Sequence, residues 1–203
     1  MKSLSEIDTV SKRASRASGF DWGIAEEVGK NTRMLEMFGL PGVRNLNHYY
    51  KIRIKKKFEK INLINENNKK TQLEYCPIIA GVNFLDQVRS LDNINKIIFQ
   101  NIAFPILFLP FISRASEVIG KKILLKIDNR NFLLNFNNSI YSNSLNDGIT
   151  TIGNNVEISF KENNDSFNEN EWKELYKHSE KTFVEENDSL KQSGAGAGLT
   201  DND

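Results

Sequence analysis

The longest apolar run in the sequence, residues 97–112 (IIFQNIAFPILFLPFI), sets the strongest limit on what the chain can fold into. A membrane-spanning helix needs about 18 or more consecutive apolar residues. This run is shorter, and Gln100, Asn101, Pro105 and Pro110 interrupt it. Because proline removes a backbone donor and disturbs a regular helix, we expect a buried strand followed by a turn, in a protein that is not inserted in a membrane.

The first forty residues have the periodicity of two helices. Apolar side chains recur at spacings of three and four, as Leu4, Ile7, Val10, Ala14 and Ala17 and then as Ile24, Ala25, Val28, Leu35 and Phe38. Ser3 and Asp21 have N-cap positions, and Gly19 and Gly39 have the positions of helix ends. We expect an antiparallel helix pair that packs on a sheet, with a third short helix through residues 46–50.

From about residue 71 the pattern becomes that of a sheet, because apolar runs alternate with turn residues. The runs are LEYCPIIAGVNFL, IAFPILFLP, KKILLKI, NFLLNF and VEISF. A turn at 128–131 predicts a hairpin of strands 122–128 and 131–136, and residues 111–120 have the pattern of a short helix that ends at glycine.

The sequence therefore predicts an α+β fold with an N-terminal helical pair or triple, a mostly antiparallel sheet, a C-terminal helix and a tail. We expect one domain over residues 1–192, with a helical part at 1–50, a sheet part at 71–161 and a helix at 168–187, and then a flexible acidic tail at 193–203. One side of that last helix carries Trp172, Leu175, Tyr176, Ser179 and Phe183.

The composition argues against several classes of function. The 203 residues have a formal net charge of +1, so the chain lacks the basic footprint of a dedicated nucleic-acid binder. A helix–turn–helix alternative in the first two helices is opposed by Glu26, Glu27 and Glu36, which would repel phosphates. One cysteine and two histidines predict no disulfide and no metal centre. No phosphate-binding loop stands in the required strand–helix context, so we expect no cofactor.

Charge is distributed unevenly along the chain. Residues 51–60 (KIRIKKKFEK) hold six bases and one acid. Such a run is typical of a segment that binds nucleic acid or a membrane surface, or of a solvated strand edge, and we prefer the strand edge here. Residues 157–203 hold twelve acids and five bases. The sequence ends in GAGAGLTDND, in which Leu199, Thr200, Asp201 and Asp203 have a composition that suits docking better than folding.

Several single residues are candidates for a site. Asp86, Arg114 and Glu26 are candidate catalytic groups for acid–base chemistry or for holding an anion. Arg33 and Trp22 are candidate binding residues. Cys76 is either a nucleophile activated by a histidine or, as we prefer, a buried and unreactive thiol in an apolar strand.

Four segments of the chain, taken together, carry a resemblance to a known family. They are SLSEI, ASG, WGIAEEVG and GLPG within residues 3–42; CPI at 76–78 with Gly81 and Asp86; LPF at 109–111 with Arg114 and Ala115; and the terminal GAGAGLTDND. Together they resemble a bacterial family known only as a domain of unknown function. The resemblance implies no activity, but it directs attention to the tail and to residues 22–27.

These observations leave two classes of function open. The first is a non-catalytic accessory or interaction subunit of a metabolic enzyme, which docks through the acidic tail. The alternative is a small-molecule enzyme whose site its own tail closes, and a DNA-associated regulator is a weaker third reading. The charged N-terminus, MKSLSEIDTVSKRASRASG, has no apolar core of a secretory signal, so we expect a cytoplasmic protein with a protein or small-molecule partner.

Deletion of residues 193–203 should leave the melting temperature within a few degrees, because GAGAG buries little apolar surface and costs about 1–2 kcal/mol per residue to order. The same deletion should abolish partner capture or activity. Thermal melts and a pull-down with both chains check this. Unfolding of the shortened chain would contradict the first expectation, and unchanged capture would contradict the second.

Overall fold

The structure is a computed structural model that describes residues 2–69, 71–144 and 150–183. By its internal contacts the chain separates into two units, Met1–Asn163 and Asn164–Asp203. The first unit holds the sheet and five helices in its described residues, and the second holds the C-terminal helix.

The three N-terminal helices are α1 (Leu4–Ala17), α2 (Trp22–Met37) and α3 (Gly42–Arg53). The side chain of Ser3 accepts the backbone N–H of Glu6 at 3.1 Å, which confirms the first predicted cap. Asp21 has the N-cap position of α2 but makes no capping bond with its side chain. Gly19 and Gly39 have φ values of 90° and 71°, the left-handed conformation that glycine adopts most readily.

Six strands form one sheet in the described residues, in the order β1-β2-β6-β3-β4-β5. They are β1 (Asn67–Asn68), β2 (Ile97–Ala103), β3 (Lys122–Ile127), β4 (Arg130–Asn135), β5 (Ser139–Ser142) and β6 (Ile152–Lys161). The pairing of β1 with β2 is parallel, and the other neighbours run antiparallel. The predicted hairpin is confirmed as β3 and β4, with Leu124 opposite Leu133.

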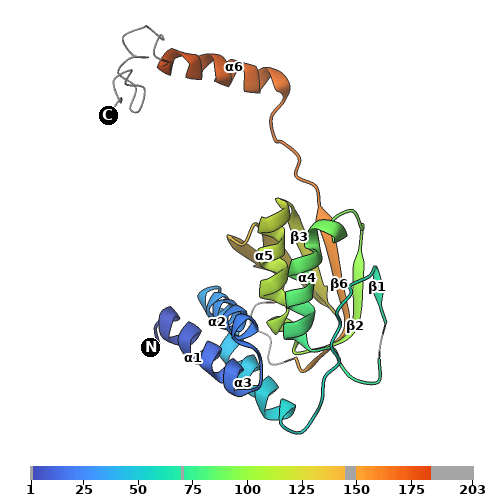
Figure 1. The fold of residues 1–203 in the computed structure, drawn as a ribbon. Helices are drawn as coiled ribbons and strands as arrows, with labels where there is room; N and C mark the ends of the chain where they lie inside the picture. The colour runs from blue at the N-terminus through green and yellow to red at the C-terminus, as the bar shows by residue number, and fades with distance from the viewer. Residues whose placement is uncertain (1, 70, 145–149, 184–203) are drawn as a thin grey trace, which may run out of the picture. The chain divides into compact units, whose positions relative to one another are not determined.

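Two helices, α4 (Pro77–Leu91) and α5 (Leu109–Ile119), lie side by side over one face of the sheet, and the three N-terminal helices gather at one end of this layer (Figure 1). The core between the layers is rich in phenylalanine. The Phe108 ring meets those of Phe99 and Phe84 edge-on, at centroid distances of 5.3 and 6.1 Å. Edge-on contact is a favourable geometry for aromatic rings.

The expected strand that begins at Leu73 is wrong, because most of its residues form α4. Proline at the first position of a helix loses nothing by lacking an N–H, and Pro77 has that place, with Cys76 as the N-cap. The buried residues of α4 then follow a helical period. Ile78, Phe84 and Val88 all lie on its inner side.

The interpretation of residues 97–112 is confirmed in its first half and wrong in its second. Ile97–Ala103 form the buried strand β2, and a 3-10 turn follows at Pro105–Leu107. The second half, however, enters α5 two residues earlier than predicted, with Pro110 in its first turn. That place explains why the second proline does not break the helix.

The basic segment is not a strand edge. Its first residues end α3, and the rest form a loop in which Glu59 makes an isolated bridge with Tyr75. The α+β class, the N-terminal helices and the mostly antiparallel sheet are confirmed.

In the second unit, α6 (Glu169–Ser179) continues into a 3-10 turn, η2 (Glu180–Thr182), and neither contains a buried residue. The predicted helix is confirmed over these residues, and the end that we expected at residue 187 lies outside the described part of the chain. Among the described residues, no helix is long and apolar enough to cross a membrane.

The contact between α4 and α5 predicts the effect of one methyl group. A Cβ added at Gly81 would overlap the ring of Phe111, whereas one added at Gly23 in α2 would meet nothing within 4 Å. Gly81→Ala should therefore lower the free energy of unfolding by about 1–3 kcal/mol. Gly23→Ala should leave it unchanged or raise it by up to about 1 kcal/mol. Urea titrations measure both, and equal stabilities would contradict the packing.

Candidate functional site

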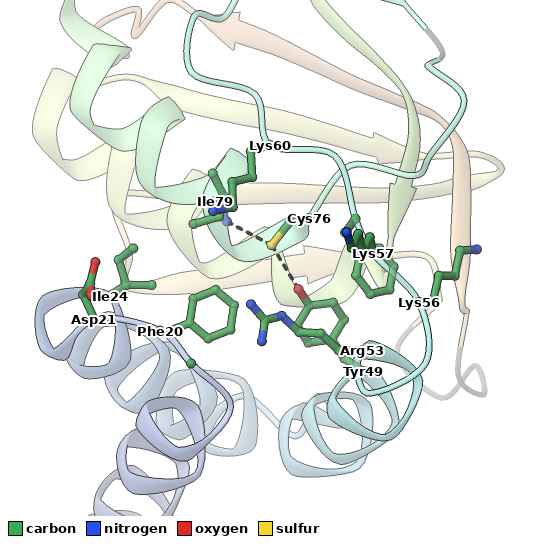
Figure 2. A pocket seen from close by; sticks show the side chains of 12 residues that line it. Phe20, Asp21, Ile24, Tyr49, Arg53, Lys56, Lys57, Lys60, Cys76 and Ile79 are labelled. Atoms are coloured by element: carbon green, nitrogen blue, oxygen red, sulfur yellow. Dashed lines mark hydrogen bonds between the residues drawn. The ribbon is translucent and has the colours of Figure 1, made fainter.

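A pocket of about 390 Å³ opens in the first unit where four segments meet: the turn between α1 and α2, the end of α3, the loop after α3 and the start of α4 (Figure 2). Its apolar and aromatic walls are Phe20, Ile24, Tyr49, Phe58 and Ile79, and its charged residues are Asp21, Arg53, Lys56, Lys57 and Lys60. This size and this mixture of apolar walls with few polar groups are usual for small-molecule sites.

The guanidinium of Arg53 is held in place on two sides. Its Cζ lies 4.3 Å from the centroid of the Phe20 ring, which it faces in Figure 2, and its Nη1 donates to the carbonyl of Ser18. The latter contact crosses from α3 to the end of α1. Because an arginine has five N–H donors in a planar fork, the group is fixed and still has donors for a ligand.

The lysines of the rim differ in their partners. Lys56 Nζ lies 2.6 Å from the carboxylate of Glu74, so its charge is largely neutralised. In the described part of the chain, Lys57 and Lys60 have no acidic partner. The pocket therefore has an excess of positive charge despite Asp21, which also lines it. Such an excess attracts anions.

Cys76 and Tyr49 form the buried end of the pocket. The hydroxyl of Tyr49 and the sulfur of Cys76 are 3.0 Å apart, and Cys76 Sγ accepts the N–H of Ile79 at 3.5 Å (Figure 2). Cys76 is only 4% exposed, so the predicted burial is confirmed, although the residue caps a helix and does not lie in a strand.

Both groups are neutral at physiological pH. Burial raises the pKa of the Cys76 thiol, and the hydrogen bonds from Tyr49 and from the start of α4 only partly oppose this. Burial and the neighbouring Cys76 raise the pKa of Tyr49. A helix N-terminus ordinarily favours a thiolate, but here the loss of water outweighs it. The unreactive thiol stays a prediction.

The backbone fixes this end of the pocket from both sides. The N–H of Cys76 donates to the carbonyl of Glu59 at 2.9 Å, in the loop that carries the lysines. The N–H of Tyr75 donates to the carbonyl of Asn101 in β2 at 2.8 Å. Residues 74–76 therefore tie the loop to the sheet.

The structure does not bring the three candidate catalytic residues together. Asp86 is exposed on α4, and Glu26 is exposed on α2, where Lys12 Nζ donates to it at 3.2 Å. Arg114 lies within α5, not after a strand end, and forms an ion pair with Glu27. None of the three lines the pocket.

That ion pair is structural in its effect. Burial acts to raise the pKa of Glu27, but hydrogen bonds from Arg114 and Lys30 outweigh it, so the pKa lies below its ordinary value. The pair joins α2 to α5. The carboxylate is thus held ionised as a partner for the guanidinium, which leaves Arg114 little freedom to bind another anion.

The remaining predicted binding residues lie apart from the pocket or outside the described residues. Trp22 is exposed, with the guanidinium carbon of Arg16 5.7 Å from its ring centroid, and Arg33 is exposed on α2. Leu199, Thr200, Asp201 and Asp203 lie outside the described part of the chain. No group of three His, Cys, Asp or Glu residues that could hold a metal occurs among residues 2–69, 71–144 and 150–183.

Sequence reasoning missed Arg53, Lys57 and Lys60 as site residues, although it singled out the segment that contains them. The signal was the basic run directly after a predicted helix, with Phe58 inside it. The strand-edge interpretation treated these lysines as solvated side chains. The sequence does not show that Phe20 and Cys76 line the same pocket as the lysines.

The raised pKa of Cys76 predicts a loss of stability in alkali. The folded chain holds the thiol proton to higher pH than the unfolded chain, whose thiol has a pKa of about 8.5. The buried neutral thiol therefore makes its full contribution to the free energy of unfolding at pH values below the pKa of the unfolded thiol. Above it, the free energy of unfolding should fall by up to about 1.4 kcal/mol per pH unit until the folded pKa is reached.

Urea titrations between about pH 7.5 and 10 measure this loss, before most tyrosines titrate. Cys76→Ser, which has no group that titrates in this range, is the comparison. Its free energy of unfolding should fall less steeply with pH. Parallel pH profiles of the two proteins would contradict the buried neutral thiol.

Comparison with known proteins relates the N-terminal part of the chain to a family. Residues 2–76 match the model of a family described as a protein of unknown function (DUF3726). No curated protein and no solved structure matches the chain. The matched part runs from α1 to Cys76, so it includes the turn, helix and loop that build most of the pocket, and it ends before Asp86 and Arg114. Over these residues the chain is similar to a family whose members have no described activity.

Proposed function

We propose that the pocket binds a small molecule that has an anionic group and an apolar or aromatic body. The observation that carries this is the fixed guanidinium of Arg53, which stacks on Phe20 at the pocket wall and bonds to Ser18. A guanidinium held in this way loses little entropy when it binds a carboxylate or phosphate. Lys57 and Lys60 add positive charge at the rim.

The walls favour binding over covalent catalysis. A thiol is a nucleophile only as a thiolate, and burial keeps Cys76 protonated. A histidine is the usual base for such a thiol, and neither His48 nor His178 lines the pocket. The neutral hydroxyl of Tyr49 and the thiol instead satisfy one another at the buried end of the pocket.

Of the two function classes that the sequence leaves open, the small-molecule enzyme shares with this proposal a small-molecule site, but the pocket supports binding and not catalysis. Closure of the site by residues 193–203 concerns residues outside the described part of the chain. The accessory-subunit class is favoured by a different observation, the exposed apolar side of α6, on which Trp172, Tyr176 and Leu175 are between 49% and 62% exposed.

Binding of phenyl phosphate, followed by ligand-observed NMR, tests the proposal, with benzyl alcohol as a neutral compound of similar body. Arg53→Lys keeps the charge but loses the planar fork, and we expect it to weaken binding by about tenfold. Lys57→Gln with Lys60→Gln should weaken it several-fold, and both effects should decrease with added salt.

The matched control is Lys51→Gln with Lys55→Gln, which removes two charges from the same segment at exposed positions that do not line the pocket. This variant should bind like the wild type. Equal weakening by the control pair would show a diffuse charge effect, and binding of benzyl alcohol as tight as that of phenyl phosphate would contradict an anion site. Thermal melts of each variant verify folding.

A further inference from the structure

The helix α6 is built by local interactions, without a buried core. Asn168 accepts the N–H groups of Asn170 and Glu171 at 3.0 and 3.1 Å, and the carboxylate of Glu171 accepts the N–H of Asn168 at 2.7 Å. This reciprocal capping box satisfies free donors at the helix start. The rings of Phe167 and Trp172 stack at 5.6 Å, in the positions of a hydrophobic staple.

One side of this helix carries large apolar side chains that the described residues of its own unit do not bury. They are Trp172, Leu175 and Tyr176 on the helix, with Phe167 before it and Phe183 just after η2, and each is about half exposed or more. Spacings of three and four place the three helical residues in one stripe. A preformed helix with an uncovered apolar stripe gains free energy when a second surface removes that stripe from water.

The charges of α6 favour a second copy of the same helix in antiparallel orientation. Its first turn is acidic, with Glu169 and Glu171, and its last turn is basic, with Lys177 and His178. An antiparallel pair keeps the acidic first turns of the two copies apart, whereas a parallel pair would place these like charges beside one another. Residues 169–183 hold four acids and three lysines, so two copies repel one another little.

Two residues set the register of such a pair. At 100° per residue, Lys173 and Glu180 border the apolar stripe on the same side. With a two-fold axis between Tyr176 and Lys177, Lys173 of one copy lies beside Glu180 of the other, and the same contact occurs twice. In the single chain, Lys173 Nζ is only loosely placed, 3.9 Å from the carboxylate of Glu169.

We propose that α6 is a dimerisation helix, which pairs two copies of the chain antiparallel through its apolar stripe. The dimer is weak. Large side chains bury about 150–250 Å² each when fully covered, and about half of this for five side chains gives roughly 500 Å² per copy, below the roughly 800 Å² of a standard interface. The association is therefore concentration-dependent, in the micromolar range or above.

Sedimentation velocity of the full chain, over a concentration series from about one to several hundred micromolar, tests the proposal. The wild type should shift from monomer to dimer within this range. Leu175→Glu, at the centre of the stripe, should stay monomeric throughout. Glu174→Lys, a charge reversal in α6 on the side opposite the apolar stripe, is the matched control and should dimerise like the wild type.

Charge reversal distinguishes this dimer from other arrangements. Lys173→Glu alone and Glu180→Lys alone should each weaken the dimer several-fold, and the double variant should restore it, because the pair then forms with its signs exchanged. Circular dichroism of each variant verifies the helix. A wild type that is monomeric at every concentration, or a dimer that survives Leu175→Glu, would overturn the proposal. Failure of the double variant to recover would overturn the antiparallel register.

Discussion

The backbone bonding of residues 74–76 is the constraint on which the rest of the first unit depends. Tyr75 pairs with β2 through the carbonyl of Asn101 and the N–H of Ala103, while Cys76 pairs with Glu59 in the loop after α3. One short segment thereby joins the sheet to the helical part. It also fixes where α4 starts, since Cys76 is the cap and the helix begins one residue later.

The pocket follows from this junction. With the start of α4 fixed, the thiol meets the hydroxyl of Tyr49 on α3, and the loop that Cys76 holds carries the lysines past the same opening. Arg53 closes the other side against Phe20. The polar groups at the buried end stay neutral because water is excluded, and the cations stay at the rim, where water solvates them. This separation is what an amphipathic anion requires.

The two units are stabilised in different ways. In the first, helices and strands bury phenylalanine and aliphatic side chains, and Gly81 allows α4 and α5 to approach closely. In the second, the described helix depends on its own cap and staple, and its apolar side chains are exposed. The proposed ligand binding and the proposed association therefore involve separate parts of the chain, so variants can test each one without the other.

The sequence by itself determined the features that local interactions control: the caps and glycine ends of the N-terminal helices, the β3–β4 hairpin, the apolar stripe of α6 and hence the α+β class. It did not determine α4, because the helix begins with an almost continuous apolar run, in which a helical period and a buried strand look alike, and the place of Pro77 at a helix start was the available signal. Nor did it determine the site. Arg53, Phe20 and Cys76 lie far apart in the chain, and long-range packing alone decides that they meet.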